Sequence, residues 1–257
     1  MVTKWLRNRH ITRWPLLGLG VGGAAAAVIA LSVGPGRAAS DPADAVALSA
    51  AKSVSSVASN SGIATHYVLQ AGGGNCSYPG PPASHLFVAL SAPEYNGAAP
   101  CGSYLMVKGP GGSVRVEVID QCPECKAGHI DLSEAAFAKL APLVKGIIPV
   151  SYHTIANPPL PAPVAFEVKN GSSRWWLALF VMNTGNAIAS VQVETRPGHW
   201  LKLAHSNWNG WIAQQGAGPG PFTVRVTDAL GHQVTIHHVA LRPGTVQRTG
   251  TWMYGHH

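Results

Sequence analysis

A proline-dense segment from Asn157 to Pro163 divides the chain into two parts of different composition. Four of its seven residues are proline, and each ring fixes φ and removes a backbone donor, so the segment is stiff and extended. All four cysteines precede it, and six of the eight tryptophans follow it. The 257 residues are enough for two domains with their own cores. We therefore expect a domain at 60–157, a proline-rich linker at 158–163 and a second domain at 164–257.

The first forty residues have the composition of an export signal. Basic residues precede an apolar, acid-free stretch from Trp14 to Val33, and small residues at 38–40 would allow cleavage. The stretch is long for a signal peptide, so it could also stay as an anchor. We predict a signal peptide or anchor at 1–38, a linker at 39–59, and a secreted, extracellular protein. Membrane contact is expected only through an uncleaved leader.

The charge of the chain lies mostly in that leader. Five basic residues before position 38 supply five of the seven net positive charges, which leaves +2 for the remainder. The pI of about 9.4 therefore overstates the basicity of the folded part. We expect no nucleic-acid partner. A mildly basic exported protein can still prefer acidic wall polymers, by an attraction that weakens with salt.

Alternating residues predict strands in both halves. Valines at 114, 116 and 118 alternate with Arg115 and Glu117, as in a half-buried strand. With further short strands, a turn at 109–112 and a short helix near 134–140, the first half predicts a small barrel. The second half predicts an antiparallel sandwich of about seven short strands. Six of them are expected at 165–169, 174–182, 190–195, 199–203, 222–227 and 233–239.

Two aspartates frame a short cysteine loop within residues 120–133. Asp120 ends the valine strand and could simply cap a turn through its side chain. Asp131 precedes a predicted helix and could belong to the helix start. Neither role explains two carboxylates, a Gly-His turn and a Cys-x-x-Cys loop within fourteen residues of an exported chain. We interpret the stretch as the floor of a polysaccharide groove.

The cysteines predict two disulfides. An even number in one domain of an exported chain is typical of disulfides, and four cysteines allow three pairings. We favour Cys76 with Cys101 and Cys122 with Cys125. A thioredoxin-like redox pair is the rival, but the loop after Cys125 does not continue as a helix. A zinc site lacks a second ligand pair at finger spacing, so no metal and no cofactor are expected.

Tryptophans concentrate in the second half. Exposed indole rings stack on the apolar faces of sugars, whereas most tryptophans are core residues. Strand alternation would send either Trp175 or Trp176 inward, unless the pair lies at a bulge or a twisted strand end. Both a binding platform and ordinary core packing stay open. The six residues are Trp175, Trp176, Trp200, Trp208, Trp211 and Trp252.

Five motifs, in order, resemble those of the microbial expansins. The resemblance covers roughly residues 60–250 and implies an all-β protein of two domains. These would be a six-stranded double-psi β-barrel and an immunoglobulin-like β-sandwich that binds cellulose. The motifs are Gly-Ile-Ala-Thr-His-Tyr67, Cys-Gly-Ser-Tyr-Leu105, Val-Ile-Asp-Gln-Cys-Pro-Glu124, His-Ile-Asp-Leu-Ser133 and Lys-Asn-Gly-Ser-Ser-Arg-Trp-Trp176.

The resemblance also implies site residues. Thr65, Asp120 and Asp131 would line the groove and position a glucan chain, with Asp131 where related inverting endoglucanases hold their general acid. The family often has a tyrosine two residues after the first aspartate, and this chain has Cys122 there. A disulfide would then shape the groove in place of an aromatic ring.

In the second domain the family's platform of three aromatic rings maps onto Trp175, Trp176 and Trp208. Lys169 lies beside it. The resemblance therefore implies a carbohydrate-binding surface made of these four residues.

The inventory of carboxylates favours a protein that is not an enzyme. Inverting hydrolysis needs a second carboxylate ~6.5 to 9.5 Å from the acid. The endoglucanase relatives carry this base where Leu69 stands here, and no acid lies between residues 60 and 70. We expect a monomer that binds cellulose and other wall polysaccharides and loosens their contacts. Three alternatives stay open. The protein could be an endoglucanase, or a peptidoglycan lytic transglycosylase, which can act with one acidic residue. It could also be a wall-binding module that does not loosen walls.

Overall fold

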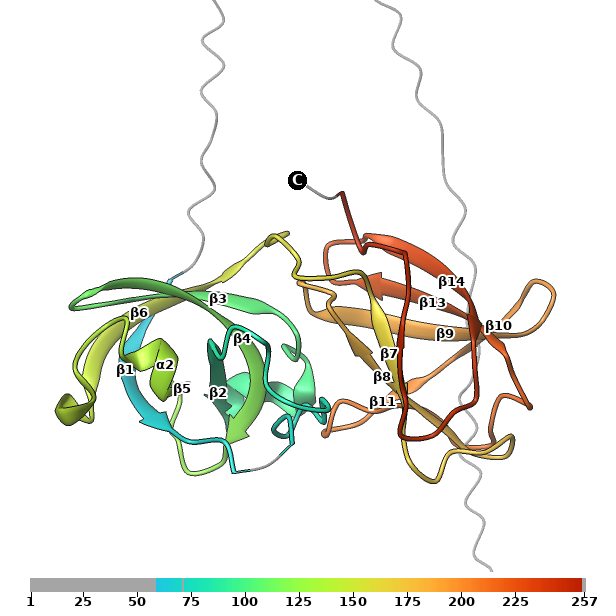
Figure 1. Cartoon of the computed structure of the whole chain (residues 1–257), viewed down its shortest axis with the longest axis horizontal. Coiled ribbons are helices and arrows are strands. Elements are labelled where there is room, and N and C mark those ends of the chain that lie inside the picture. Colours follow the sequence, from blue (N-terminus) through green and yellow to red (C-terminus); the bar gives the residue numbers. More distant parts are fainter. Residues whose placement is uncertain (1–58, 71, 256–257) are drawn as a thin grey trace, which may run out of the picture. The chain divides into compact units, whose positions relative to one another are not determined.

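The computed structural model describes residues 59–70 and 72–255 (Figure 1). The leader predicted at 1–38, and all but the last residue of the linker predicted at 39–59, lie outside these ranges. The described residues belong to one compact unit of the chain. None of the helices in the described ranges has the length and apolar character that a bilayer crossing requires.

Six strands close a barrel in the order β1-β5-β2-β4-β3-β6 (Figure 1). The pairs β1–β5 and β2–β4 are parallel, and the other four pairs are antiparallel. The strands are β1 (Asn60–Tyr67), β2 (Phe87–Ser91), β3 (Tyr104–Gly109), β4 (Gly112–Cys122), β5 (His129–Ser133) and β6 (Ile148–Ile155).

The valine alternation of β4 faces the barrel core as predicted. Val114, Val116 and Val118 are buried, and the intervening Arg115 is exposed. The pattern ends at Ile119, which is also buried, because the register of β2 against β4 shifts there. Such a bulge re-aims the side chain that follows it. Here that side chain is Asp120.

Short helices close the gaps between the strands: α1 (Ala92–Tyr95), α2 (Glu134–Phe137) and the 3-10 turns η1 (Asn96–Ala98) and η2 (Leu143–Lys145). The predicted helix near 134–140 is therefore present but shorter. Its N-cap is Ser133, whose Oγ accepts a hydrogen bond from the amide of Ala136 at 3.2 Å. Ser133 caps this helix, so Asp131 is a residue of β5 and does not cap the helix.

Two sheets form the sandwich, in the orders β10-β9-β13-β14 and β11-β12-β8-β7-β15. Their facing valine, leucine and phenylalanine side chains make a core of its own, with Phe166, Leu179 and Val224 fully or almost fully buried. The strands are β7 (Ala165–Val168), β8 (Leu177–Met182), β9 (Ile188–Arg196), β10 (His199–Lys202), β11 (Ala204–His205), β12 (Trp211–Ala213), β13 (Phe222–Asp228), β14 (Gln233–Val239) and β15 (Val246–Arg248). The predicted all-β fold of barrel and sandwich is confirmed.

One predicted strand was wrong at its start. The pattern predicted 174–182, but β8 begins at Leu177, because residues 172–176 form a turn. Ser172 closes it, with its Oγ accepting from the amide of Ala178 at 3.1 Å. Ser173 and Trp176 pair across it as an isolated bridge. Strand alternation therefore does not govern the tryptophan pair.

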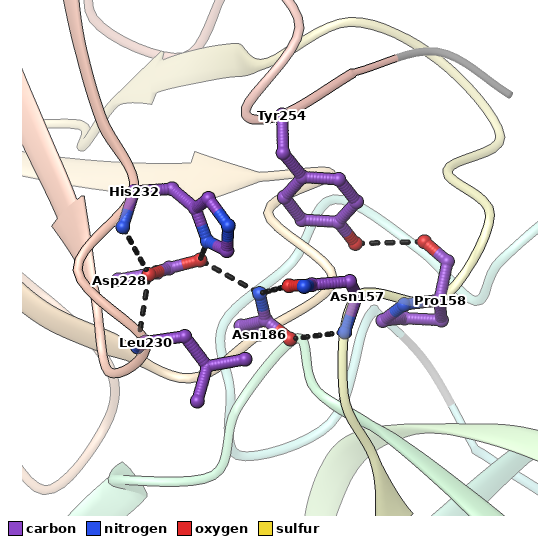
Figure 2. Close-up of polar contacts among 7 residues, drawn as sticks. All are labelled: Asn157, Pro158, Asn186, Asp228, Leu230, His232 and Tyr254. Atoms are coloured by element: carbon purple, nitrogen blue, oxygen red, sulfur yellow. Dashed lines mark hydrogen bonds and ion pairs between the residues drawn. The ribbon is translucent and has the colours of Figure 1, made fainter. Parts of the chain in front are cut away.

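A polar network holds the end of the barrel domain at the linker to the sandwich (Figure 2). Asn157 and Asn186 exchange two hydrogen bonds, at 2.9 and 2.8 Å, and Asn186 Nδ2 also donates to Asp228 Oδ2 at 2.7 Å. Asp228 is 1% exposed and also accepts from the amide and ring of His232 and from the amide of Leu230. Burial alone would raise the pKa of Asp228, but these hydrogen bonds outweigh it and hold the pKa below its usual value.

Candidate functional site

Asp120 is fixed by three hydrogen bonds. Its Oδ1 accepts from the amides of Asn75 at 2.7 Å and Gln121 at 2.8 Å, and its Oδ2 accepts from the Tyr67 hydroxyl at 3.2 Å. Burial and the neighbouring charge of Asp120 raise the pKa of Tyr67 above its usual range, so the phenol keeps its proton. These three hydrogen bonds fix the carboxyl group of Asp120 in one orientation.

Asp131 is held from the neighbouring strand. Thr65 is its register partner in the parallel pair of β1 and β5, and its hydroxyl donates to Asp131 Oδ1 at 2.6 Å. His129 Nε2 lies 2.9 Å from the same hydroxyl. Since Thr65 uses its single hydrogen on Asp131, the His129 nitrogen must donate to Thr65. Burial raises the pKa of Asp131, and the bond from Thr65 and the nearby His129 partly oppose this rise.

The two aspartates lie at matching register positions on the barrel strands. We call the row formed by Thr65, Asp131, Ala89 and Asp120 the aspartate rung. Ala89 of β2 is the register partner of Asp120 on one side and of Asp131 on the other. Thr65 continues the same rung. Register partners point to the same face of a sheet, and two strand spacings of ~4.8 Å separate the aspartate backbones by about 10 Å. The structure thus brings together the three groove residues expected from the sequence.

Both predicted disulfides are present. Cys76 pairs with Cys101 and Cys122 pairs with Cys125, at Cα–Cα distances of 5.7 and 5.3 Å. The second disulfide packs against Ala89 and the ring of Tyr67. The position where the family often has a tyrosine therefore contributes a buried disulfide sulfur beside the aspartate rung.

Leu69 follows β1 and packs against the barrel core. This is the position where the endoglucanase relatives carry a base. Its apolar side chain can neither accept nor hold a proton. The rung therefore contains Asp131, whose raised pKa suits an acid, and Asp120, whose carboxyl group accepts three hydrogen bonds.

The sandwich places the three tryptophans of the predicted platform in turns, in different environments. Trp175 is 70% exposed, whereas Trp176 and Trp208 are half-buried. Lys169 Nζ lies 5.8 Å from the centre of the Trp208 ring, so the lysine is beside the aromatic group as expected. Phe180 supports Trp208 from its edge, with ring centres 5.7 Å apart. Because the pair at 175–176 precedes β8, neither ring is fully buried in the sandwich core.

Other tryptophans serve the fold. Trp211 is 3% exposed and stacks on His205 with ring centres 4.1 Å apart. Trp200 carries the guanidinium of Arg225 over its ring at 3.7 Å. Core packing and surface exposure, which the sequence left open, therefore apply to different members of the set.

The turn that carries Trp208 is hydrogen-bonded to the loop that holds Asp120. Ser77 Oγ donates to the Trp208 carbonyl at 2.8 Å, and Asn209 Nδ2 donates to the Cys76 carbonyl at 3.0 Å. Asn75, whose amide binds Asp120, also donates through its side chain to the Asn207 carbonyl at 3.3 Å. These bonds link the turn that carries Trp208 to the loop that holds Asp120.

Sequence reasoning missed three residues of this arrangement: Tyr67, Asn75 and His129. Tyr67 shares a face with Thr65 at a spacing of two in β1, so alternation could have found it. His129 has the same relation to Asp131 in β5. Asn75 reaches Asp120 through a backbone amide in a loop, and side-chain chemistry gives no signal for such a contact. Within the described ranges, no three His, Cys, Asp or Glu side chains gather to hold a metal ion.

Two family models match the chain. One is described as lytic transglycolase and covers residues 86–152, and the other, the expansin C-terminal domain, covers 164–240. Expansin-YoaJ of Bacillus subtilis is 34% identical over 53% of this chain, and expansin-like protein 1 of Dictyostelium discoideum is 29% identical over 68%. The chain spans 58% and 65% of the lengths of these two relatives.

A solved structure matches over its whole length. The expansin of Clavibacter michiganensis is 45% identical, covers 78% of this chain, is itself covered completely, and superposes with a TM-score of 0.74. It is known without ligand and, as a mutant, in complex with cellohexaose. With a closed barrel that carries the aspartate rung and a sandwich that matches the expansin C-terminal model, the chain belongs to the microbial expansins.

Proposed function

We propose that this protein is a secreted expansin that binds cellulose through its sandwich and loosens contacts between wall polymers without hydrolysis. Expansins are generally secreted, non-hydrolytic proteins of cell walls, which supports the proposal. The complex of the Clavibacter relative with cellohexaose supports a β-glucan as the ligand.

The platform supplies the binding in this proposal. Trp175, Trp176 and Trp208 offer indole faces to successive glucose rings, whose C–H groups pack on aromatic surfaces. Lys169, beside Trp208, can donate to sugar hydroxyls. A crystalline glucan surface suits such a site because its chains expose their ring faces.

The rung supplies the positioning. Asp120 and Asp131 present oxygen acceptors to the hydroxyl groups of a second chain, and Thr65 orients Asp131 through its hydrogen bond. Each carboxylate oxygen has two lone pairs, so Asp120 can still accept from a sugar hydroxyl while its three protein donors hold it. The bonds between the platform turn and the Asn75 loop would transmit force between the two chains.

One observation carries the non-hydrolytic part: Leu69 packs on the barrel core where a base would stand. Asp131 has the raised pKa of an acid, but the side chain of Leu69 cannot act as the base that would activate water. Inverting hydrolysis needs both an acid that protonates the leaving oxygen and a base that activates water. An acid alone gives little hydrolysis by this route.

Two assays on one preparation test this proposal. Wall extension under constant load should rise, while reducing-end release from cellulose and xyloglucan should stay at background. Muropeptide release from peptidoglycan is the third arm, because the barrel matches the lytic transglycolase model. Clear release in any arm that disappears in Asp131→Asn would replace the proposal with the enzyme alternative.

A further inference from the structure

A cavity apart from the aspartate rung opens beside β4. Its volume is about 520 Å³, within the range of roughly 300 to 1,000 Å³ typical of small-molecule sites. Its polar lining includes Tyr104, Arg115, Glu117, Asn183 and Arg248. Prolines and the aliphatic residues Leu86, Ile119 and Met182 form the rest of the wall. We call this the Glu117 cavity.

Glu117 is a titratable group that the proposed function does not use. It points away from the barrel core, between the inward-facing Val116 and Val118, and its Oε2 accepts from the Tyr104 hydroxyl at 3.1 Å. Burial raises the pKa of Glu117 to about 7, although the bond from Tyr104 and the charge of Arg115 oppose the rise. Near neutral pH this carboxyl can therefore hold a proton and donate it to a ligand.

The groups around Glu117 make the cavity positive. Arg115 lies over the Tyr104 ring at 5.1 Å and donates to the Pro159 carbonyl at 3.2 Å, which leaves four of its five N–H donors for other partners. Arg248 of β15 is exposed at the rim. The remaining titratable neighbours are Tyr78 and Tyr104, whose pKa values burial raises above their usual range. Both stay neutral.

This combination fits one ligand chemistry. Arg115 and Arg248 are positively charged, whereas Glu117 can be protonated and neutral, so the cavity favours an anion. Guanidinium groups bind carboxylates in a bidentate manner. A wall of prolines and aliphatic side chains suits the C–H face of a sugar ring. Asn183, together with a protonated Glu117, can bind hydroxyl groups.

We propose that the Glu117 cavity binds a uronate, the carboxylated sugar unit of an acidic wall polysaccharide. The ligand carboxylate meets Arg248 and Arg115, and Glu117 donates to a ligand oxygen. The inference rests on the proposed function only in taking the ligand to be a wall sugar. It adds a second polymer class, bound at a place away from the tryptophan platform.

Calorimetry with trigalacturonate tests the site. Its methyl ester removes only the charge, and cellotriose is the neutral control. Trigalacturonate should bind at least tenfold more tightly than either. Its carboxylates stay ionised from pH 5.5 to 8.5, so a site that needs protonated Glu117 should lose affinity by roughly tenfold or more over this range. Equal binding of the methyl ester would overturn the proposal.

Variants distinguish binding in the Glu117 cavity from nonspecific attraction of the anion to basic residues on the surface. Arg248→Gln should weaken trigalacturonate binding at least tenfold, whereas Arg242→Gln, an exposed arginine outside the cavity lining, should not. Glu117→Gln keeps a donor at every pH and should remove most of the pH dependence. An unchanged pH profile in Glu117→Gln, or equal losses in both arginine variants, would refute the uronate site.

A cellulose pull-down of each variant keeps the two proposals apart. Arg248→Gln and Glu117→Gln should bind cellulose as the parent does. Failure of the parent to bind cellulose would contradict the proposed function, and the calorimetry would still decide the uronate site by itself.

Discussion

The hydroxyl of Thr65 donates to Asp131 across the parallel pair of β1 and β5, with an oxygen–oxygen distance of 2.6 Å. His129 must then supply a hydrogen to the same hydroxyl, whose oxygen lies 2.9 Å from its Nε2. Thr65 thus connects a histidine to the carboxylate that we place at the centre of wall loosening. Its own hydroxyl serves two partners and keeps little capacity for a sugar.

Thr65→Val tests this connection, because valine keeps the shape and removes the hydroxyl. The bond from Thr65 lowers the pKa of Asp131 against the effect of burial, so its loss should raise that pKa further. Wall loosening should fall severalfold at neutral pH, while cellulose binding should stay. Carbon NMR of the Asp131 carboxyl and wall extension measure the two effects. Thr235→Val, on an exposed strand position, is the matched control. Full loosening by Thr65→Val would contradict the role of the hydroxyl.

Asp131→Asn should reduce loosening without destabilising the fold. Burial raises the pKa of Asp131 on folding, so the protonated form suits the folded state. The stability that this gives is present below the unfolded pKa and is lost as pH rises through the folded pKa. At neutral pH the ionised group therefore costs stability, and Asn should keep or slightly raise Tm. A clear fall in Tm at neutral pH would show that the carboxylate is structural.

Much of the fold follows from short-range pattern. The period of two in 113–119 predicts β4, because its valines fill the barrel core. The cysteine count predicts two disulfides, and the favoured pairing is the one in the structure. Strands of two or three residues, such as β11, β12 and β15, carry too little pattern to be predicted.

The aspartate site was only partly predictable for a different reason. Thr65, Asp120 and Asp131 come from motifs, but the rung that joins them depends on Ala89 and on a register shift between β2 and β4. The contact of Asn75 with Asp120 uses a backbone amide, and Glu117 shares a cavity with the distant Arg248. Such contacts are set by tertiary packing, which local pattern does not encode.

Measurements of stability should distinguish the platform tryptophans from a tryptophan of the core. Trp175→Ala, Trp176→Ala and Trp208→Ala should each weaken cellulose binding, and Trp175→Ala should leave Tm unchanged because its ring is 70% exposed. Trp211→Ala is the core control and should cost ~3 to 5 kcal/mol of folding free energy. Pull-down on cellulose and thermal melts give both readouts. Unchanged binding in all three platform variants would move the cellulose site elsewhere.

The polar network at the linker predicts that the stability of the fold decreases at acidic pH. Hydrogen bonds from Asn186 and His232 hold the pKa of the buried Asp228 below its usual value, so this group stabilises the fold above its unfolded pKa. That stability is lost as pH falls through the folded pKa. Asp228→Asn should lower Tm at pH 7, and the difference from the parent should shrink below about pH 4.

Melting curves from pH 7 to pH 2 check this behaviour, with Glu194→Gln on an exposed hairpin as the control. Asn186 joins Asp228 to the linker, because it donates to Asp228 and exchanges two hydrogen bonds with Asn157. Asn186→Ala should therefore expose the linker at 157–163 to proteolysis while Asp228 keeps its bonds to His232 and Leu230. A constant Tm difference between Asp228→Asn and the parent across the pH range would show that the charge of Asp228 contributes nothing to stability.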